Sequence, residues 1–190
     1  MSKDYKQITT PEAILSFPHL FEPQAAPGST RETYNAMLIF PKGTDLTTLK
    51  EAAKAAYAQA FPNGAKGARS PLRDGNEKVE EWGEVFRDAT YIRVSSQFKP
   101  AVVDRRKAFI TDPERVFGGQ FVRAVVHAYG YDVSGNKGVA FGFDAIQIIR
   151  DGEPLGTGGS AAAVGLFNDL GDEDGKAPAP APAAGGGMFD

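Results

Sequence analysis

The sequence predicts an α+β fold that is mainly β: a small barrel with one helix, long loops and a disordered acidic C-terminal tail. Apolar segments with the spacing of strands outnumber helical ones, and glycine-rich turns separate them, which favours the barrel. The Pro/Ala/Gly-rich end of the chain lacks the apolar residues that a core needs. The 190 residues, 42% of them hydrophobic, suffice for one domain. We expect this domain over residues 1–165 and the tail over 166–190.

The first clear elements are a strand and a helix. Residues 34–40, YNAMLIF, are apolar and end before a proline, which predicts a strand. Residues 43–61, GTDLTTLKEAAKAAYAQAF, place apolar side chains at helical spacing, with Thr44 or Asp45 in position to cap the first turn. Pro62 and the Asn-Gly that follows it end this helix.

A loop and a further strand follow the helix. Residues 62–81 are charged, rich in turn-forming residues and without an apolar period, which predicts a long surface loop. Trp82, the only tryptophan, is expected as a core anchor. Residues 90–96, TYIRVSS, predict a strand.

A β-hairpin is predicted from the next two apolar segments. Residues 117–133 and 138–150 both have the composition of strands. The SGNKG that joins them offers Gly135, Asn136 and Gly138 as residues for the positive φ angles of a hairpin turn.

The first strand of this hairpin has two chemically different faces, because side chains alternate along a strand. The small aliphatic face, suited to packing inward, consists of Val122, Ala124, Val126 and Ala128. The other face consists of Phe121, Arg123, Val125, His127, Tyr129 and Tyr131. On a half-exposed sheet, such rings stack nucleic-acid bases while the cations contact phosphates. The alternative is that this face packs under a helix or a partner and the arginine extends to solvent.

The residue types exclude several kinds of catalytic site. There is no cysteine, and the only histidines are His19 and His127, so a zinc site of histidine and cysteine ligands cannot form. The densest carboxylate cluster, GDEDG at residues 171–175, lies in the predicted tail and is typical of a solvated charge run. No G-x-S-x-G nucleophile elbow occurs. We therefore expect no enzyme, no metal and no other cofactor.

Basic side chains gather in the centre of the chain, although the net charge is only −3. Residues 87–123 carry eight basic and four acidic residues, whereas residues 169–190 carry one basic and five acidic residues. Such an asymmetry points to nucleic acid as a partner. The candidate DNA-binding residues combine this basic region with the aromatic strand face: Arg93, Lys99, Arg105, Arg106, Lys107, Arg123, His127, Tyr129 and Tyr131.

Six sequence blocks, which appear in the order expected, resemble a known family. The blocks are SFPHLFEP, MLIFPKG, SPLRDGNEK, KPAVVD, VFGGQFVRAVVHAYGYD and NKGVAFGFDAIQIIRDGEPL. They span about residues 14 to 157 and resemble the phage single-stranded-DNA-binding proteins formerly classified as a domain of unknown function. That family is similar in fold to the single-stranded-DNA-binding proteins of short-tailed coliphage replisomes.

The resemblance implies an OB-fold barrel that coats and protects single-stranded DNA, without strong sequence preference, in phage replication and recombination. It also implies a tail that competes with DNA for the basic groove and binds polymerase, helicase or primase. The tail residues that would do so are Asp172, Glu173, Asp174, Phe189 and Asp190. This sequence departs from the family pattern, because a Pro/Ala/Gly spacer separates its acidic run from the final Met188-Phe189-Asp190.

The remaining expectations concern location and assembly. The N-terminal MSKDYKQITTPEAIL has no apolar signal-peptide segment, and no stretch approaches a membrane span, so we expect a soluble, intracellular protein. The resemblance to phage proteins implies the cytoplasm of an infected bacterial cell. The sequence leaves open whether the chain is a monomer or a homodimer, whether it binds RNA and whether it promotes strand annealing. The alternative function is a structural or protein-interaction module of a phage, without DNA binding.

Overall fold

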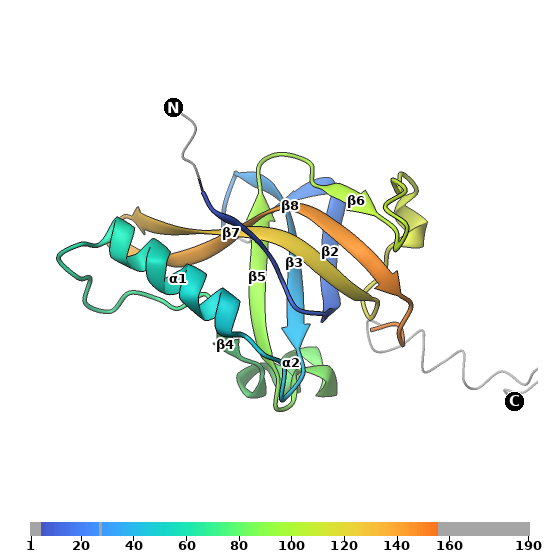
Figure 1. The fold of residues 1–190 in the computed structure, drawn as a ribbon, viewed down its shortest axis with the longest axis horizontal. Coiled ribbons are helices and arrows are strands. Elements are labelled where there is room, and N and C mark those ends of the chain that lie inside the picture. Colours follow the sequence, from blue (N-terminus) through green and yellow to red (C-terminus); the bar gives the residue numbers. More distant parts are fainter. Residues whose placement is uncertain (1–4, 27, 156–190) are drawn as a thin grey trace, which may run out of the picture. The chain divides into compact units, whose positions relative to one another are not determined.

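Five long strands pair edge to edge into a closed barrel in the computed structural model, which describes residues 5–26 and 28–155 (Figure 1). These strands are β2 (Ala13–Ala25), β3 (Glu32–Phe40), β5 (Thr90–Ser96), β7 (Phe121–Val133) and β8 (Asn136–Arg150). The pairs β2–β3, β3–β5, β7–β8 and β2–β7 are antiparallel. The parallel pair of β5 with β8 closes the ring. The predicted OB-like barrel is thus confirmed, and five strands form it.

Shorter strands pair with the barrel strands, and helices and 3₁₀ turns lie in the connections between them. β1 (Gln7–Thr9) pairs with β7, β4 (Arg73–Asp74) pairs with β5, and β6 (Ala101–Val103) runs parallel to β8. The helices are α1 (Thr47–Ala60), where the sequence predicts one, and the four-residue α2 (Val79–Trp82). Short 3₁₀ turns lie at Gly75–Lys78, Glu84–Phe86 and Pro113–Arg115.

The interior of the barrel confirms the period of two predicted for β7. Val122, Ala124 and Val126 are buried, while Arg123 between them is exposed. Removing such apolar surface from water is the main favourable term in folding. The large, fully buried side chains around them come from every other barrel strand: Leu15, Leu20, Leu38, Phe40, Ile92, Phe141, Phe143 and Ile146.

Helix α1 packs against the hairpin end of β7. Gly130 permits this approach, because a Cβ atom at that position would overlap the Cβ of Ala60. Leu46 is the N-cap of α1, in place of the predicted Thr44 or Asp45, and the Asp45 carboxylate just before it accepts a hydrogen bond from the Thr47 N–H at 2.9 Å. A second bond, from the Thr47 hydroxyl, contributes most to lowering the pKa of Asp45. The chain leaves the helix at Phe61, and the N–H of Gly64 donates to the Phe61 carbonyl.

A second, smaller apolar cluster lies outside the barrel wall, on β3 and β5. It contains buried Ile39, Phe86 and Tyr91, with Trp82 packed edge-on to Tyr91 at 5.8 Å. Trp82, predicted as a core anchor, is partly buried and packs against this outer cluster, outside the barrel interior. The prediction of an irregular loop over residues 62–81 is wrong for its second half, where β4, a 3₁₀ turn and α2 form. These elements pack closely because Gly75 has no side chain to separate them from the carbonyls of Phe86 and Ala89.

Two further local differences from the sequence prediction concern β2 and the hairpin turn. The pairing of Val133 with Asn136 leaves Ser134 and Gly135 as the turn, with φ angles of 51° and 83°. Asn136 and Gly138, predicted as turn residues, belong to β8 instead. No strand is predicted over β2, because the strand's apolar period is broken at Phe17, where φ is 46° and the register with β3 shifts.

Candidate nucleic-acid interface

One row of residues crosses the outside of the barrel from β1 to β3. Gln7 of β1 lies opposite His127 of β7, and His127 lies opposite Gly142 of β8. Gly142 lies opposite Ser95 of β5, which in turn lies opposite Asn35 of β3. Neighbouring strands are about 4.8 Å apart, so a ligand along this row would cross five strands over roughly 19 Å. We call it the transverse row.

A groove of about 570 Å³ lies over the middle of the transverse row, at His127, Gly142 and Ser95. It is lined by Tyr5, Arg31, Thr33, Ser95, Ser96, Gln97, Phe98, His127, Tyr129, Gly142 and Asp144. His127 and Tyr129 are thus the two predicted DNA-binding residues that the structure brings into the groove. Rings, hydroxyl groups and a guanidinium together can stack bases, donate hydrogen bonds and neutralise a phosphate.

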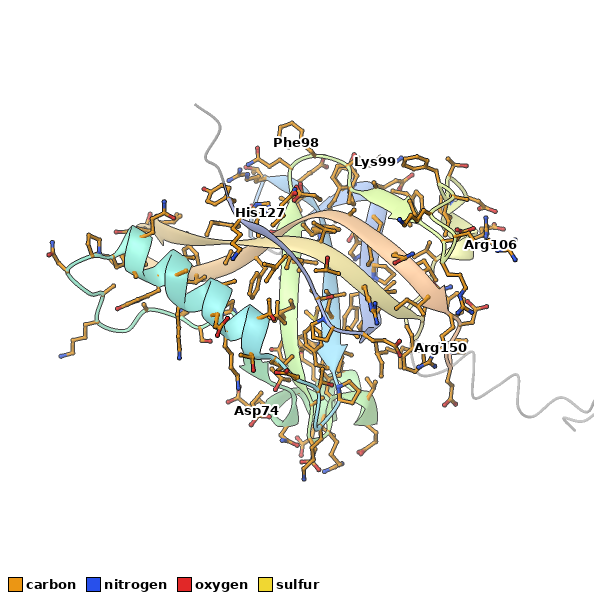
Figure 2. All side chains as sticks on the ribbon, in the orientation of Figure 1. Asp74, Phe98, Lys99, Arg106, His127 and Arg150 are labelled. Carbon is orange, nitrogen blue, oxygen red and sulfur yellow. The ribbon has the colours of Figure 1, made fainter. Side chains whose placement is uncertain are left out.

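Three aromatic side chains of the groove form a cluster, and a fourth, Phe98, is exposed to solvent. Tyr5 stacks on His127 with ring centres 5.0 Å apart and an angle of 19° between the planes. Tyr129 lies 6.1 Å from each of these rings. Phe98 is 82% exposed and lies above His127 in Figure 2. An apolar ring so open to solvent contributes little to the core and is free to stack on a base.

Gly142 forms the floor beneath His127. A Cβ atom there would come within 2.6 Å of the imidazole Cε1 and closer still to Nε2, so only glycine lets the ring lie flat across β8. The ring is also held at its edge, where Nδ1 lies 3.2 Å from the Asp144 carboxylate. The same carboxylate oxygen accepts a hydrogen bond from the Gln7 side-chain amide at 2.8 Å. His127 is therefore fixed on three sides, by Gly142, Asp144 and Tyr5.

Positive charge lies along the β3–β5 side of the groove. Arg31, at the end of the loop between β2 and β3, is exposed and lines the groove. Arg93 is exposed on β5, two residues before Ser95 and hence on the same outer face. His19 lies opposite Asn35 and continues the transverse row onto β2. Burial, and secondly the charge of Arg93, lowers the pKa of His19, so its ring is neutral at pH 7.

The other predicted cations lie outside the lining of the groove. Lys99 follows Phe98 in the exposed loop after β5 and holds its Nζ 5.5 Å from the ring of Phe21. Arg105, Arg106 and Lys107 are exposed on a tight turn after β6. Figure 2 shows Lys99 near the top of the molecule and Arg106 to the right of it, both on the upper side with His127.

Asp104 shapes the turn that carries these three basic residues. Its carboxylate accepts hydrogen bonds from the N–H groups of Arg106 and Ala108, at 2.8 and 2.9 Å. The side chain of Gln147 donates to the carbonyl of Arg105 at 3.3 Å, which ties the turn to β8. Phe109, at the end of the turn, is 73% exposed. The turn therefore has an ordered backbone and presents three cations and a ring to solvent.

The last two predicted residues share β7 with His127. Arg123 is exposed and lies opposite Gln147. Tyr131 lies at the hairpin end of β7, with its hydroxyl over Gly138. Neither residue lines the groove, and both lie on the strand face that includes His127.

Comparison with known proteins identifies the family. Residues 6–177 match the family described as the single-stranded-DNA-binding protein of Enterobacter phage Enc34. The chain belongs to this Enc34 family. It is also 33% identical, over 169 residues, to protein p50 of Acyrthosiphon pisum secondary endosymbiont phage 1, covering 82% of this chain and 89% of that protein.

Solved structures share the fold of the barrel. The single-stranded DNA-binding protein of bacteriophage Enc34, in complex with single-stranded DNA, matches with a TM-score of 0.68 and 18% identity, covering 79% of this chain and 89% of that one. The single-stranded DNA-binding protein gp2.5 of bacteriophage T7 matches with a TM-score of 0.59 and 13% identity, covering 90% of this chain and 100% of that one. The resemblance stated from the sequence blocks is thus confirmed for family and fold.

Several groove residues of this Enc34-family chain are not among those predicted from its sequence. Tyr5, Arg31, Ser95 and Asp144 are brought into the groove by pairings between strands that are distant in sequence. Phe98 could have been predicted as a binding residue, because it begins the basic segment 98–110. The predicted tail residues, Asp172 to Asp174 and Met188 to Asp190, lie outside the described residues, as does the predicted boundary at residue 165.

Within residues 5–26 and 28–155, no three His, Asp or Glu side chains are grouped so as to hold a metal ion. No helix in these ranges is long and apolar enough to cross a membrane. A second groove, between α1 and residues 68–72, is mainly apolar and is lined at its rim by Lys50, Lys54 and Arg69.

Proposed function

We propose that this chain binds single-stranded DNA along the transverse row and coats it, without strong sequence preference, during phage DNA replication and recombination. The observation that carries the proposal is the groove itself, in which Tyr5, His127 and Tyr129 lie beside Arg31 and close to Arg93. Stacking rings next to cations are what a single strand requires, because its bases and its phosphates are both accessible. Membership of the Enc34 family supports the same conclusion.

The expected energetics divide between stacking and charge. Each base stacked on an aromatic side chain contributes about 1–3 kcal/mol, largely regardless of base identity. Each phosphate that a cation neutralises releases counterions and gives a slope of about −0.7 in log K against log salt. Contacts from Arg31, Arg93 and Lys99 together therefore predict a slope of roughly −2.

Fluorescence anisotropy of labelled oligo-dT, across a salt series, tests the proposal. The oligonucleotide should have about 16 nucleotides, the upper site size of one OB fold. We expect binding that weakens with salt, and binding at low salt that is weaker for Arg93→Ala and Tyr129→Ala. Lys42→Ala is the matched control for the lost charge, because Lys42 is exposed and lies near Asp74, at the lower end of the molecule in Figure 2. Absence of binding at low salt would favour the alternative, a protein-interaction module.

Several finer parts of the proposal concern roles beyond DNA contact. The chain acts by binding, without catalysis and without a cofactor, in the cytoplasm of an infected bacterial cell. The tail recruits phage replication proteins such as polymerase, helicase or primase, through its acidic segment Asp172–Asp174 and its terminal Phe189-Asp190. Partner proteins recognise peptides of this kind through pockets for an apolar ring and through basic side chains that bind carboxylates. Pull-down of these proteins by the full chain, and not by a chain truncated after Asn168, tests this role. Sedimentation at several concentrations distinguishes a monomer from a homodimer.

A further inference from the structure

Asp144 is an extra residue in β8 whose side chain is turned into the groove. Val125 of β7 pairs with Ala145, and Val126 pairs with Phe143, so Asp144 has no partner on β7. The buried positions of β8 change parity at this point, from Phe143 before it to Ile146 after it. A β-bulge of this kind redirects a side chain, and here it places a carboxylate on the outer face.

This carboxylate is the only acidic side chain that lines the groove among the described residues. One of its oxygens, Oδ2, accepts from Gln7 and from His127. The other oxygen, Oδ1, accepts no hydrogen bond from the described residues, and the side chain is 41% exposed. Asp144 is thus held in place by one oxygen and offers the other to a ligand.

A carboxylate in a groove that binds a polyanion restricts which group of the DNA strand can lie against it. A carboxylate repels phosphates, which carry like charge, and an ionised carboxylate only accepts hydrogen bonds. The strand groups that suit it are therefore the donor groups on base edges. Cytosine offers an exocyclic amino group, N4, that a carboxylate accepts from, whereas thymine and uracil present the carbonyl O4 at the same place. Their one edge donor, N3–H, lies between two carbonyl oxygens that repel a carboxylate.

We propose that Asp144 gives the groove a preference for bases that carry an exocyclic amino group over thymine and uracil. This inference rests on the proposed function, because it assumes that bases stack on Tyr5 and Tyr129, the rings beside His127. Stacking brings a base edge next to Asp144, since the carboxylate lies 3.2 Å from the imidazole Nδ1. One additional hydrogen bond to a base edge predicts a preference of about threefold to tenfold.

The test compares oligo-dC with oligo-dU and oligo-dT of about 12 nucleotides, a length within the range of one OB fold. Cytosine and uracil have the same ring size and differ at the N4 amino group and the N3 proton, and uracil lacks the thymine methyl group, so stacking is closely matched. Affinities are measured at pH 8, where cytosine is neutral. We expect oligo-dC to bind about threefold to tenfold more tightly than oligo-dU.

Two variants show whether Asp144 causes the preference. Asp144→Asn keeps the shape of the side chain, removes the charge and adds an amide donor that suits O4, so the ratio of the two affinities should fall to one or reverse. Asp132→Asn is the matched control, because Asp132 is an exposed carboxylate at the hairpin end of β7, ion-paired with Lys137 and outside the groove lining. It should leave the ratio unchanged.

The outcomes separate the two proposals. Tight binding of all three oligonucleotides with equal affinity by the unmodified chain overturns the role of Asp144 and leaves the proposed function standing. A preference for oligo-dC that persists in Asp144→Asn overturns that role as well, because another group must then select the base. Failure to bind any of them at low salt overturns both proposals.

Discussion

Replacing Gly142 with alanine tests whether the flat placement of His127 matters for DNA binding. The new Cβ would lie within 2.6 Å of the imidazole Cε1, whereas carbon atoms pack at about 3.5–4.0 Å. The ring must therefore withdraw by roughly 1 Å. This movement disturbs its stack on Tyr5, at 5.0 Å, and its contact with Asp144, at 3.2 Å.

The expected effects on affinity and on stability differ. Displacing one stacking platform should weaken binding of oligo-dT by about fivefold to tenfold, toward the lower end of the 1–3 kcal/mol for one base stack. Moving the ring off its preferred rotamer costs about 0.5–1.5 kcal/mol. Replacing a glycine inside a strand offsets about 0.5–1 kcal/mol of that cost. The free energy of unfolding should therefore change by less than about 1 kcal/mol.

Anisotropy with oligo-dT and urea unfolding measure the two quantities on the same preparation. Gly118→Ala is the matched control, because a Cβ there would have its nearest neighbour at 3.6 Å, an ordinary contact. It should alter neither quantity. Unchanged affinity in Gly142→Ala would refute the claim that the stacked pair of Tyr5 and His127 forms a binding platform. A large loss of stability would show instead that Gly142 serves the fold.

Three further predictions follow from the same structure. Phe98→Ala should weaken oligo-dT binding, measured by anisotropy, at least fivefold, which corresponds to about 1 kcal/mol. The urea midpoint should not change, because the Phe98 ring is 82% exposed. Equal affinity of the variant and the unmodified chain would exclude Phe98 as a stacking residue. Because the pKa of folded His19 is below its usual 6.5, the unfolded chain binds more protons, so the urea midpoint should fall as the pH is lowered from 6.5 toward the folded-state pKa. His19→Gln should lose this fall, and a midpoint that rises on acidification would contradict the sign. Truncation after Asn168 removes five acidic residues and one basic residue, so the affinity for oligo-dT at low salt should increase. An unchanged affinity would show that the tail does not compete with DNA, and would leave it only the proposed role of binding partner proteins.

Local sequence patterns predict those elements whose periodicity is uninterrupted. β5 occurs at the predicted residues 90–96, and α1 lies within the predicted 43–61. The sequence does not predict β2, because two prolines and the bulge at Phe17 interrupt the alternation of apolar and polar side chains. The turn of the hairpin is displaced because Ser134, which is not a typical residue for positive φ, adopts it.

The candidate site is predicted only as far as it lies on one strand. His127 and Tyr129 follow from the alternation along β7, which sequence shows directly. The places of Tyr5 and Asp144 cannot be predicted in this way, because they depend on the register of β1 with β7 and on the bulge in β8. A register or a bulge depends on packing between distant segments, so it leaves little trace in a single sequence.

The most direct test of the transverse row is an NMR titration of the ¹⁵N-labelled chain with oligo-dT. Binding in the groove predicts that the largest amide shifts fall on Gln7, His127, Gly142 and Ser95, which lie in register on neighbouring strands. Shifts concentrated instead around Lys50–Lys54 and Arg69, in the groove beside α1, would contradict the account.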